Sequence, residues 1–155
     1  MSSHSPLARA LRLAAFLVLS AMTLGPAAVA DTADVPDYVV EQFGAPPPVP
    51  DGALPEALSD AINTAFVDSV TQSLWGPDQN AALEVIKASG DPRVAWTISD
   101  LMRFASGPQL NLVLADAAAT LLKIETPRTN HWGVITDHLI AWDIPAPPDY
   151  LTAKR

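Results

Sequence analysis

Apolar residues recur at helical spacing through most of the chain beyond residue 53. In the first such stretch, 54–74, they return every four positions, which places them on one face of a helix. These residues are Leu58, Ile62, Phe66, Val70 and Leu74. The pair Gly76-Pro77 ends the stretch, because proline cannot continue a helix. The pattern therefore predicts a helix over 54–74.

Four more helices are predicted after this one. The second covers about 78–89 and stops at Gly90, and the third begins at Asp91-Pro92, with the aspartate as N-cap and the proline at the first helical position. The fourth covers about 108–124, and the fifth begins at Thr126-Pro127 and ends before Pro145. No alternation of polar and apolar residues is long enough to predict a sheet. The expected fold class is all-α with about five helices.

Each of these four helices has a predicted buried face. The expected core residues are Ala82, Leu83 and Ile86 in the second helix, Val94, Ile98, Leu101, Met102 and Ala105 in the third, Leu110, Val113, Leu114, Ala117 and Leu121 in the fourth, and Trp132, Ile135, Leu139 and Trp142 in the fifth.

The predicted helices form two related pairs. Gly76-Pro77 is followed by a helix and then by Asp91-Pro92-Arg93, and Gly107-Pro108 is followed by a helix and then by Thr126-Pro127-Arg128. Each pair resembles a HEAT-type helix hairpin, in which Asp-Pro-Arg commonly opens a helix. Two stacked hairpins leave apolar surface uncovered at the ends of the stack. The helix 54–74 could cap one end, and nothing in the sequence caps the other.

The first thirty residues have the pattern of an export signal. Arg9 and Arg12 precede an apolar run over 13–24, and small residues at Ala28 and Ala30 follow a Gly-Pro pair. We expect cleavage after Ala30. The apolar run is shorter than a membrane-spanning helix requires, which makes an uncleaved anchor the less favoured alternative. The expected location is therefore outside the cytoplasm, secreted or in the cell envelope, with no membrane attachment after cleavage.

The segment 31–53 differs in composition from the rest. Acidic residues alternate with prolines, including Pro46-Pro47-Pro48 and Pro50, and repeated prolines favour extended backbone. We expect an acidic linker with one short helical turn around 38–43. A proline-rich docking ligand is the alternative, but no basic residue flanks Pro46 to Pro50. The helical domain is then expected to cover 54–155.

Composition excludes several functions. The chain has 155 residues and no cysteine, so it has no disulfide, no thiol nucleophile and no cysteine-ligated metal. Its 17 acidic and 9 basic residues give a net charge of −8, which is unsuited to nucleic acid. No nucleophile elbow and no glycine-rich phosphate loop is present. We therefore predict no catalytic, cofactor-binding or metal-binding residue and no cofactor.

The remaining candidates for chemistry are few. His131 and His138 lie seven residues apart on one helix face, a spacing less common for metal ligands than three or four, and no third ligand is evident. We expect them to be solvated or at an interface. The tryptophans at 75, 96, 132 and 142 could form a binding platform, but Trp132 and Trp142 fall on an apolar face, which favours packing in the core.

The end of the chain fits two alternatives, a longer protein of which this is the first part, or a chain whose last helix frays. Asp149 is a good N-cap for a helix that would begin in 150–155, and no closing signal follows. Two strings, Asp91 to Phe104 and Asp137 to Tyr150, resemble the helical N-terminal region of an exported bacterial family, the domain-of-unknown-function family three-one-seven-nine. The resemblance covers 78–155. It implies that a larger region with histidine- and cysteine-bearing strings follows, and it carries no functional residue to this chain.

These observations predict an exported, all-helical interaction module, the N-terminal part of a larger protein. Its partner is expected to be a following domain or another protein on the apolar helical face. Two alternatives are a fragment of an exported enzyme whose catalytic region lies beyond Arg155, and a small ligand-binding protein that uses exposed tryptophans.

Overall fold

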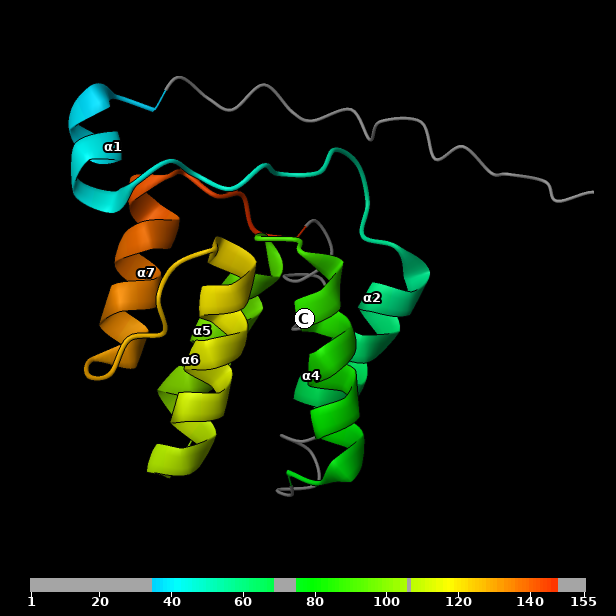
Figure 1. Ribbon diagram of the computed structural model, residues 1–155. Coiled ribbons are helices and arrows are strands. Elements are labelled where there is room, and N and C mark those ends of the chain that lie inside the picture. Colours follow the sequence, from blue (N-terminus) through cyan, green and yellow to red (C-terminus); the bar gives the residue numbers. More distant parts are fainter. Residues whose placement is uncertain (1–34, 69–74, 106, 148–155) are drawn as a thin grey trace, which may run out of the picture.

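The fold is helical throughout the part of the chain that the structure describes. The computed structural model describes residues 35–68, 75–105 and 107–147 (Figure 1). These ranges contain α1 (Asp37–Phe43), α2 (Glu56–Ile62), the π-helical segment η1 (Asn63–Asp68), α4 (Pro77–Ser89), α5 (Val94–Phe104), α6 (Pro108–Leu122) and α7 (His131–Ala141), and no strand. The all-α prediction is confirmed. The predicted leader 1–30, the end of the first predicted helix at 69–74 and the last predicted helical turn lie outside the described residues.

Two helices begin where the sequence predicts. Pro77 is the first residue of α4 and Pro108 the first of α6. Proline suits this position because its missing N–H would have no partner in the first turn. The Gly76 N–H donates to the Gln79 side chain at 2.8 Å, and Gly90 ends α4 with φ 65°, a left-handed conformation that glycine adopts without steric cost.

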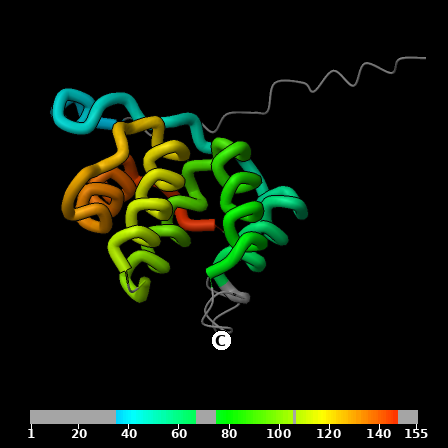
Figure 2. The backbone as a smooth tube through the Cα atoms, turned by 60° about the horizontal axis from the view of Figure 1, so that its bottom comes forward, coloured from blue at the N-terminus to red at the C-terminus, as the bar shows by residue number. Residues whose placement is uncertain are grey.

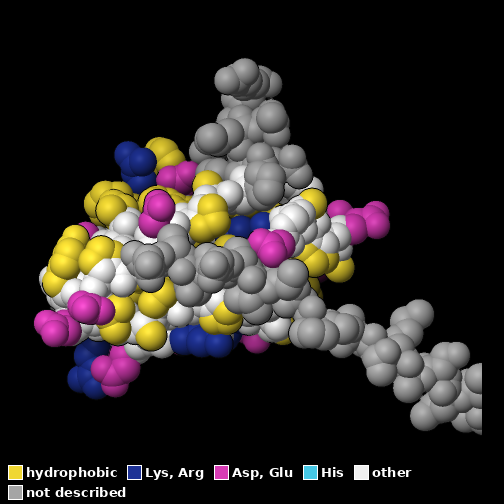
Figure 3. Space-filling model, turned by 90° about the horizontal axis from the view of Figure 1, so that it is seen from above, with side chains coloured by type: hydrophobic (Ala, Val, Ile, Leu, Met, Phe, Trp, Pro, Cys, Tyr) yellow, Lys and Arg dark blue, Asp and Glu magenta, His cyan; other side chains and the backbone are white. Residues whose placement is uncertain are grey.

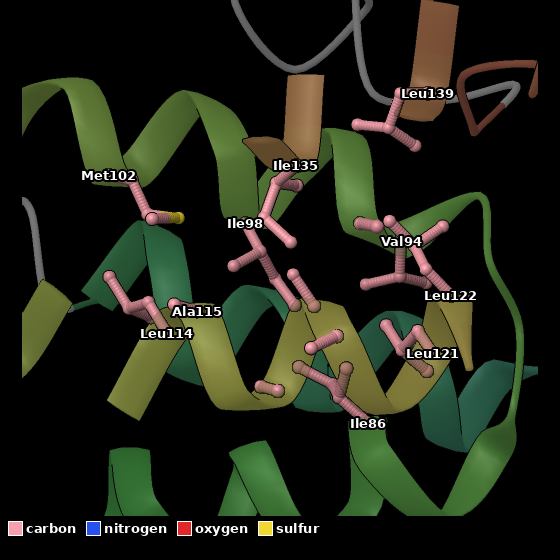
Figure 4. Close-up of a cluster of buried hydrophobic side chains, with 14 of the residues drawn as sticks. Ile86, Val94, Ile98, Met102, Leu114, Ala115, Leu121, Leu122, Ile135 and Leu139 are labelled. Carbon is pink, nitrogen blue, oxygen red and sulfur yellow. The ribbon is translucent and has the colours of Figure 1, made fainter. Parts of the chain in front are cut away.

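Helix α6 is the centre of the core. It packs against α4, α5 and α7 (Figure 2). Its buried residues are Leu114, Ala115, Ala117, Ala118, Ala119, Leu121 and Leu122. The four alanines let neighbouring helices approach closely, and the larger side chains fill the spaces between them. Figure 4 shows the result, in which Ile86 of α4, Ile98 of α5 and Ile135 of α7 point toward α6.

The core prediction is confirmed for most positions and wrong for two. Val113 is 41% exposed and Trp132 is 44% exposed. Both lie within two turns of the start of their helices. The predicted core residues Ile98, Leu114, Leu121, Ile135 and Leu139 are all fully buried.

The directions of the helices differ from the predicted hairpins. The Trp96 indole N–H donates to the Ile144 carbonyl at 2.6 Å, while Arg103 lies 5.7 Å from the centre of the Trp132 ring. The start of α5 is thus beside the end of α7, and the two helices are antiparallel. Because α5 and α6 are also antiparallel across a short connection, α6 and α7 run in the same direction (Figure 1).

The connection 123–130 allows α6 and α7 to run in the same direction because it returns along α6. The Thr126 hydroxyl donates to Asp116 Oδ1 at 3.1 Å, which fixes the connection beside the middle of α6. Helix α7 consequently begins at His131 and not at Thr126-Pro127. The predicted second HEAT-like hairpin is therefore wrong, and the closely packed antiparallel pair is α5 with α6.

The segment expected to be a linker contacts the helical domain in its described part, 35–53. Helix α1 lies against α7, and the Trp142 indole N–H donates to the Gly44 carbonyl at 3.0 Å. At the other end of the segment, Arg93 Nη1 donates to the Gly52 carbonyl at 2.6 Å. We call residues 44–53 the strap. Pro47 of the strap is buried, Pro46 and Pro50 are half-buried, and Pro48 is exposed.

A buried ion pair holds the strap and begins α5. Asp91 and Arg93 are 3% and 4% exposed, and Arg93 Nη2 lies 2.7 Å from Asp91 Oδ2. Asp91 Oδ1 also accepts from the Arg93 backbone N–H at 3.1 Å, as the predicted N-cap would. The regular helix begins slightly later than predicted, at Val94.

Candidate functional site at the lower end of the helices

Four helix ends meet at one end of the structure. The start of α4, the end of α5 and the starts of α6 and α7 all lie at the lower end in Figure 1. We call this region the lower end and define it by Trp75, Arg103, Phe104, Leu110, Val113 and Trp132. The strap and α1 lie at the opposite end, where hydrophobic and acidic side chains are interspersed (Figure 3).

The lower end exposes two aromatic side chains beside a cation. Phe104 is 76% exposed, the most exposed large hydrophobic residue of the described chain, and Trp132 is 44% exposed. The guanidinium carbon of Arg103 lies 5.7 Å from the centre of the Trp132 ring, within the range of a cation–π interaction. A guanidinium that interacts with a ring in this way still has N–H groups available to donate to other partners.

Arg103 differs from the other described cations. Lys87 pairs with Glu84 and Asp116, and Arg93 pairs with Asp91. Lys123 and Arg128 are exposed and have no ion pair within the described residues. Arg103 also has no ion pair among the residues that the structure describes, but it is the one of these three that stacks on an aromatic ring.

A shallow groove adjoins these residues. It has a volume of about 510 Å³ and is lined by Trp75, Asn80, Gly107, Pro108, Gln109, Leu110 and Val113. The Trp75 indole N–H is already bonded to Asn80 Oδ1 at 2.8 Å, so the indole presents its apolar surface. The groove therefore extends the apolar surface of the lower end from α6 toward the start of α4.

The other two tryptophans are engaged inside the fold. Trp142 is 3% exposed, which confirms its predicted place in the core, and Trp96 is half-buried with its N–H bonded to Ile144. A platform of four exposed tryptophans is therefore absent. Trp132 alone among them exposes a large part of its surface.

The two histidines have different surroundings. His138 lies edge-to-face with Phe43 and Trp142, at 5.2 and 5.0 Å between ring centres, and its Nδ1 donates to the Val134 carbonyl at 2.7 Å. His131 is half-buried, and its Nε2 has no hydrogen-bond partner. His138 thus helps to hold α1 on α7. Within the described ranges, no three His, Asp or Glu side chains are grouped so that they could hold a metal ion.

Sequence reasoning missed Arg103 and Phe104. Phe104 falls outside the apolar face that contains Ile98 and Met102, and an aromatic residue off the buried face in the last turn of a helix was the available signal. The pairing of Arg103 with Trp132 could not be predicted, because it depends on the antiparallel arrangement of α5 and α7.

Comparisons with known proteins do not add a function. No family model matches this chain, and neither curated proteins nor solved structures gave a match. Among the described residues, no helix has both the length and the apolar character needed to cross a membrane.

Proposed function

We propose that this chain is an exported helical interaction module that binds another protein domain through its lower end. The observation that carries the proposal is the exposure of Phe104 and Trp132 next to Arg103. Tryptophan, tyrosine and arginine dominate the energetically important parts of protein interfaces. Export is proposed from the leader-like pattern at 1–30.

The partner is either a domain that follows in a longer chain or a separate protein. The proposed resemblance to the exported bacterial family supports the first form, since a larger region follows the helical segment in those proteins. The net charge of −8 favours a protein partner over nucleic acid.

Site-specific photo-crosslinking tests the proposal. A benzophenone amino acid replaces Phe104 at the lower end, and in a matched control it replaces Tyr38, which is 69% exposed on α1 at the opposite end. In cells that produce and export the chain, we expect an adduct of defined mass from position 104 and none from position 38. Trp132→Ala should remove the adduct. No adduct, or the same adducts from both positions, would contradict the proposal.

The export part is tested separately by mass spectrometry of the chain recovered outside the cytoplasm. We expect its first residue to be Asp31. An N-terminus that still contains Arg9 and Arg12 in the recovered chain would contradict cleavage after Ala30.

The groove beside Trp75 supports a second candidate, a site for a small ligand. Its volume of about 510 Å³ lies within the range of ligand pockets, and Trp75, Leu110 and Val113 give it an apolar lining. The test is tryptophan fluorescence with a panel of carbohydrates and short peptides. We expect Trp75→Phe, but not Trp132→Phe, to remove the response. A response that survives Trp75→Phe would exclude this groove.

A further inference from the structure

Resting on the proposed function, we infer that Arg103 selects the partner. The partner presents an aspartate or glutamate carboxylate beside a large apolar side chain, and the carboxylate binds the guanidinium of Arg103. The apolar side chain packs on Trp132, whose ring lies 5.7 Å from the guanidinium carbon, and on Phe104, the exposed residue that follows Arg103.

Arg103 retains its capacity to bind an anion. It forms no ion pair among the described residues, in contrast to Lys87 and Arg93. Its described interaction is with the face of the Trp132 ring. A stacked guanidinium still offers its planar set of donors, which matches the two oxygens of a carboxylate.

The contact with the Trp132 ring also restricts the Arg103 side chain. A long flexible cation loses rotamer freedom when it binds, and this loss weakens exposed ion pairs. Contact with Trp132 restricts Arg103 before the partner arrives, so less entropy is lost on binding. Lys123 and Arg128 are exposed cations without such a contact.

The surroundings of Arg103 favour a carboxylate over a phosphate. Recognition of phosphorylated peptides commonly uses clusters of arginines. Arg103 is a single stacked guanidinium on a chain of net charge −8, which repels a doubly charged group more strongly than a singly charged one. The exposed rings of Phe104 and Trp132 further favour a partner that carries an apolar side chain next to its charge.

The test uses three synthetic tripeptides as probes: acetyl-Glu-Leu-Phe-amide, its Gln counterpart and its phosphoserine counterpart. Each is titrated into the ¹⁵N-labelled chain, and binding is followed by the indole N–H signal of Trp132, which is assigned with Trp132→Phe. We expect the Glu peptide to bind about threefold to fivefold more tightly than the Gln peptide at low salt, which is the upper part of the range for an exposed ion pair. The preference should shrink as salt is added.

Two variants make the test specific. Arg103→Gln should abolish the preference for Glu over Gln, whereas Lys123→Gln, which removes an exposed cation at the other end of α6, should leave it unchanged. Both positions are exposed, so both variants should keep the far-ultraviolet circular dichroism of the parent chain.

Three results would overturn the inference. These are equal binding of the Glu and Gln peptides, tighter binding of the phosphoserine peptide, and no shift of the Trp132 signal with any peptide. Equal binding of Glu and Gln peptides that is lost in Phe104→Ala would remove the role of Arg103 but leave the lower end as a protein-binding surface. The crosslinking experiment tests independently whether the lower end binds a protein, because its result does not depend on the charge of the partner.

Discussion

The ion pair of Asp91 and Arg93 should respond to mutation in an unusual order. Both side chains are almost fully buried, and the guanidinium makes contacts with Asp91 at 2.7 and 3.0 Å and with the Gly52 carbonyl at 2.6 Å. Arg93→Met leaves the Asp91 carboxylate buried without its counter-charge. Removing one partner of a buried pair costs about 3–5 kcal/mol. This loss is a large part of the roughly 5–15 kcal/mol that stabilises a typical domain.

A second substitution should restore part of this stability. Asn at position 91 keeps an oxygen that can accept the backbone N–H of residue 93 at about the present 3.1 Å, but it has no charge to leave unpaired. We therefore expect Asp91→Asn/Arg93→Met to be more stable than Arg93→Met by about 1–2 kcal/mol, although it contains one more mutation. The hydrogen bond from Arg93 to the Gly52 carbonyl is lost in both variants, so it does not contribute to the difference in stability between them.

The assay is equilibrium unfolding in urea, followed by circular dichroism at 222 nm, with the parent chain and both variants at the same protein concentration. If the dependence of the unfolding free energy on urea concentration is the same for all three proteins, the shifts in the unfolding midpoint give the differences in stability between them. If the double variant is less stable than Arg93→Met alone, the buried charge is not the source of the cost, and the reasoning is refuted.

Three further substitutions test other contacts. Trp142→Phe removes the hydrogen bond to the Gly44 carbonyl and should cost about 1 kcal/mol of stability. Amide hydrogen exchange should become faster in α1, while α6 keeps its protection. An equal increase of the exchange rate in all helices would show that α1 does not open separately. Ala118→Leu adds volume to the centre of the core and should cost about 1–3 kcal/mol or more, whereas Val113→Leu at an exposed position should change stability little, as thermal unfolding would show. Lys87→Met should cost no more than about 1 kcal/mol at pH 7. Hydrogen bonds from Lys87 to Asp116 and Glu84 raise its pKa, so the stabilisation is present at neutral pH and is lost as the pH rises through that raised pKa. The stabilities of the parent chain and of Lys87→Met, measured by urea unfolding, should therefore converge above pH 10.5. A difference that stays constant with pH would show that the ion pairs of Lys87 are not its cause.

Local signals in the sequence predicted the elements better than their arrangement. Gly76-Pro77 and Gly107-Pro108 fixed the starts of α4 and α6, because the effect of proline on a first turn needs no information from elsewhere. The start of α7 was misplaced, because the bond between Thr126 and Asp116 draws the connection back along α6. Nothing in the residues next to Thr126 encodes that contact.

The candidate site differs from the surface that the sequence predicted. The prediction was an uncovered apolar face at one end of a stack of hairpins, whereas the lower end consists of helix termini, and which termini lie together depends on the tertiary structure. Trp132 has the spacing of a core residue, and it is exposed because it lies in the first turn of α7, beside the end of α5. Its place beside Arg103 is a property of the tertiary structure, as is the isolation of Phe104 from the core.

The attachment of the strap sets an order of events during synthesis. Gly44 is hydrogen-bonded to Trp142, 98 residues later in the chain, and Gly52 is hydrogen-bonded to Arg93. The growing chain must therefore extend 41 residues beyond Gly52 before the hydrogen bond to Arg93 can form, and 98 residues beyond Gly44 before the hydrogen bond to Trp142 can form. Until then, the newly made N-terminal part has no docking place on the helices, and it is accessible to any factor that handles the nascent chain.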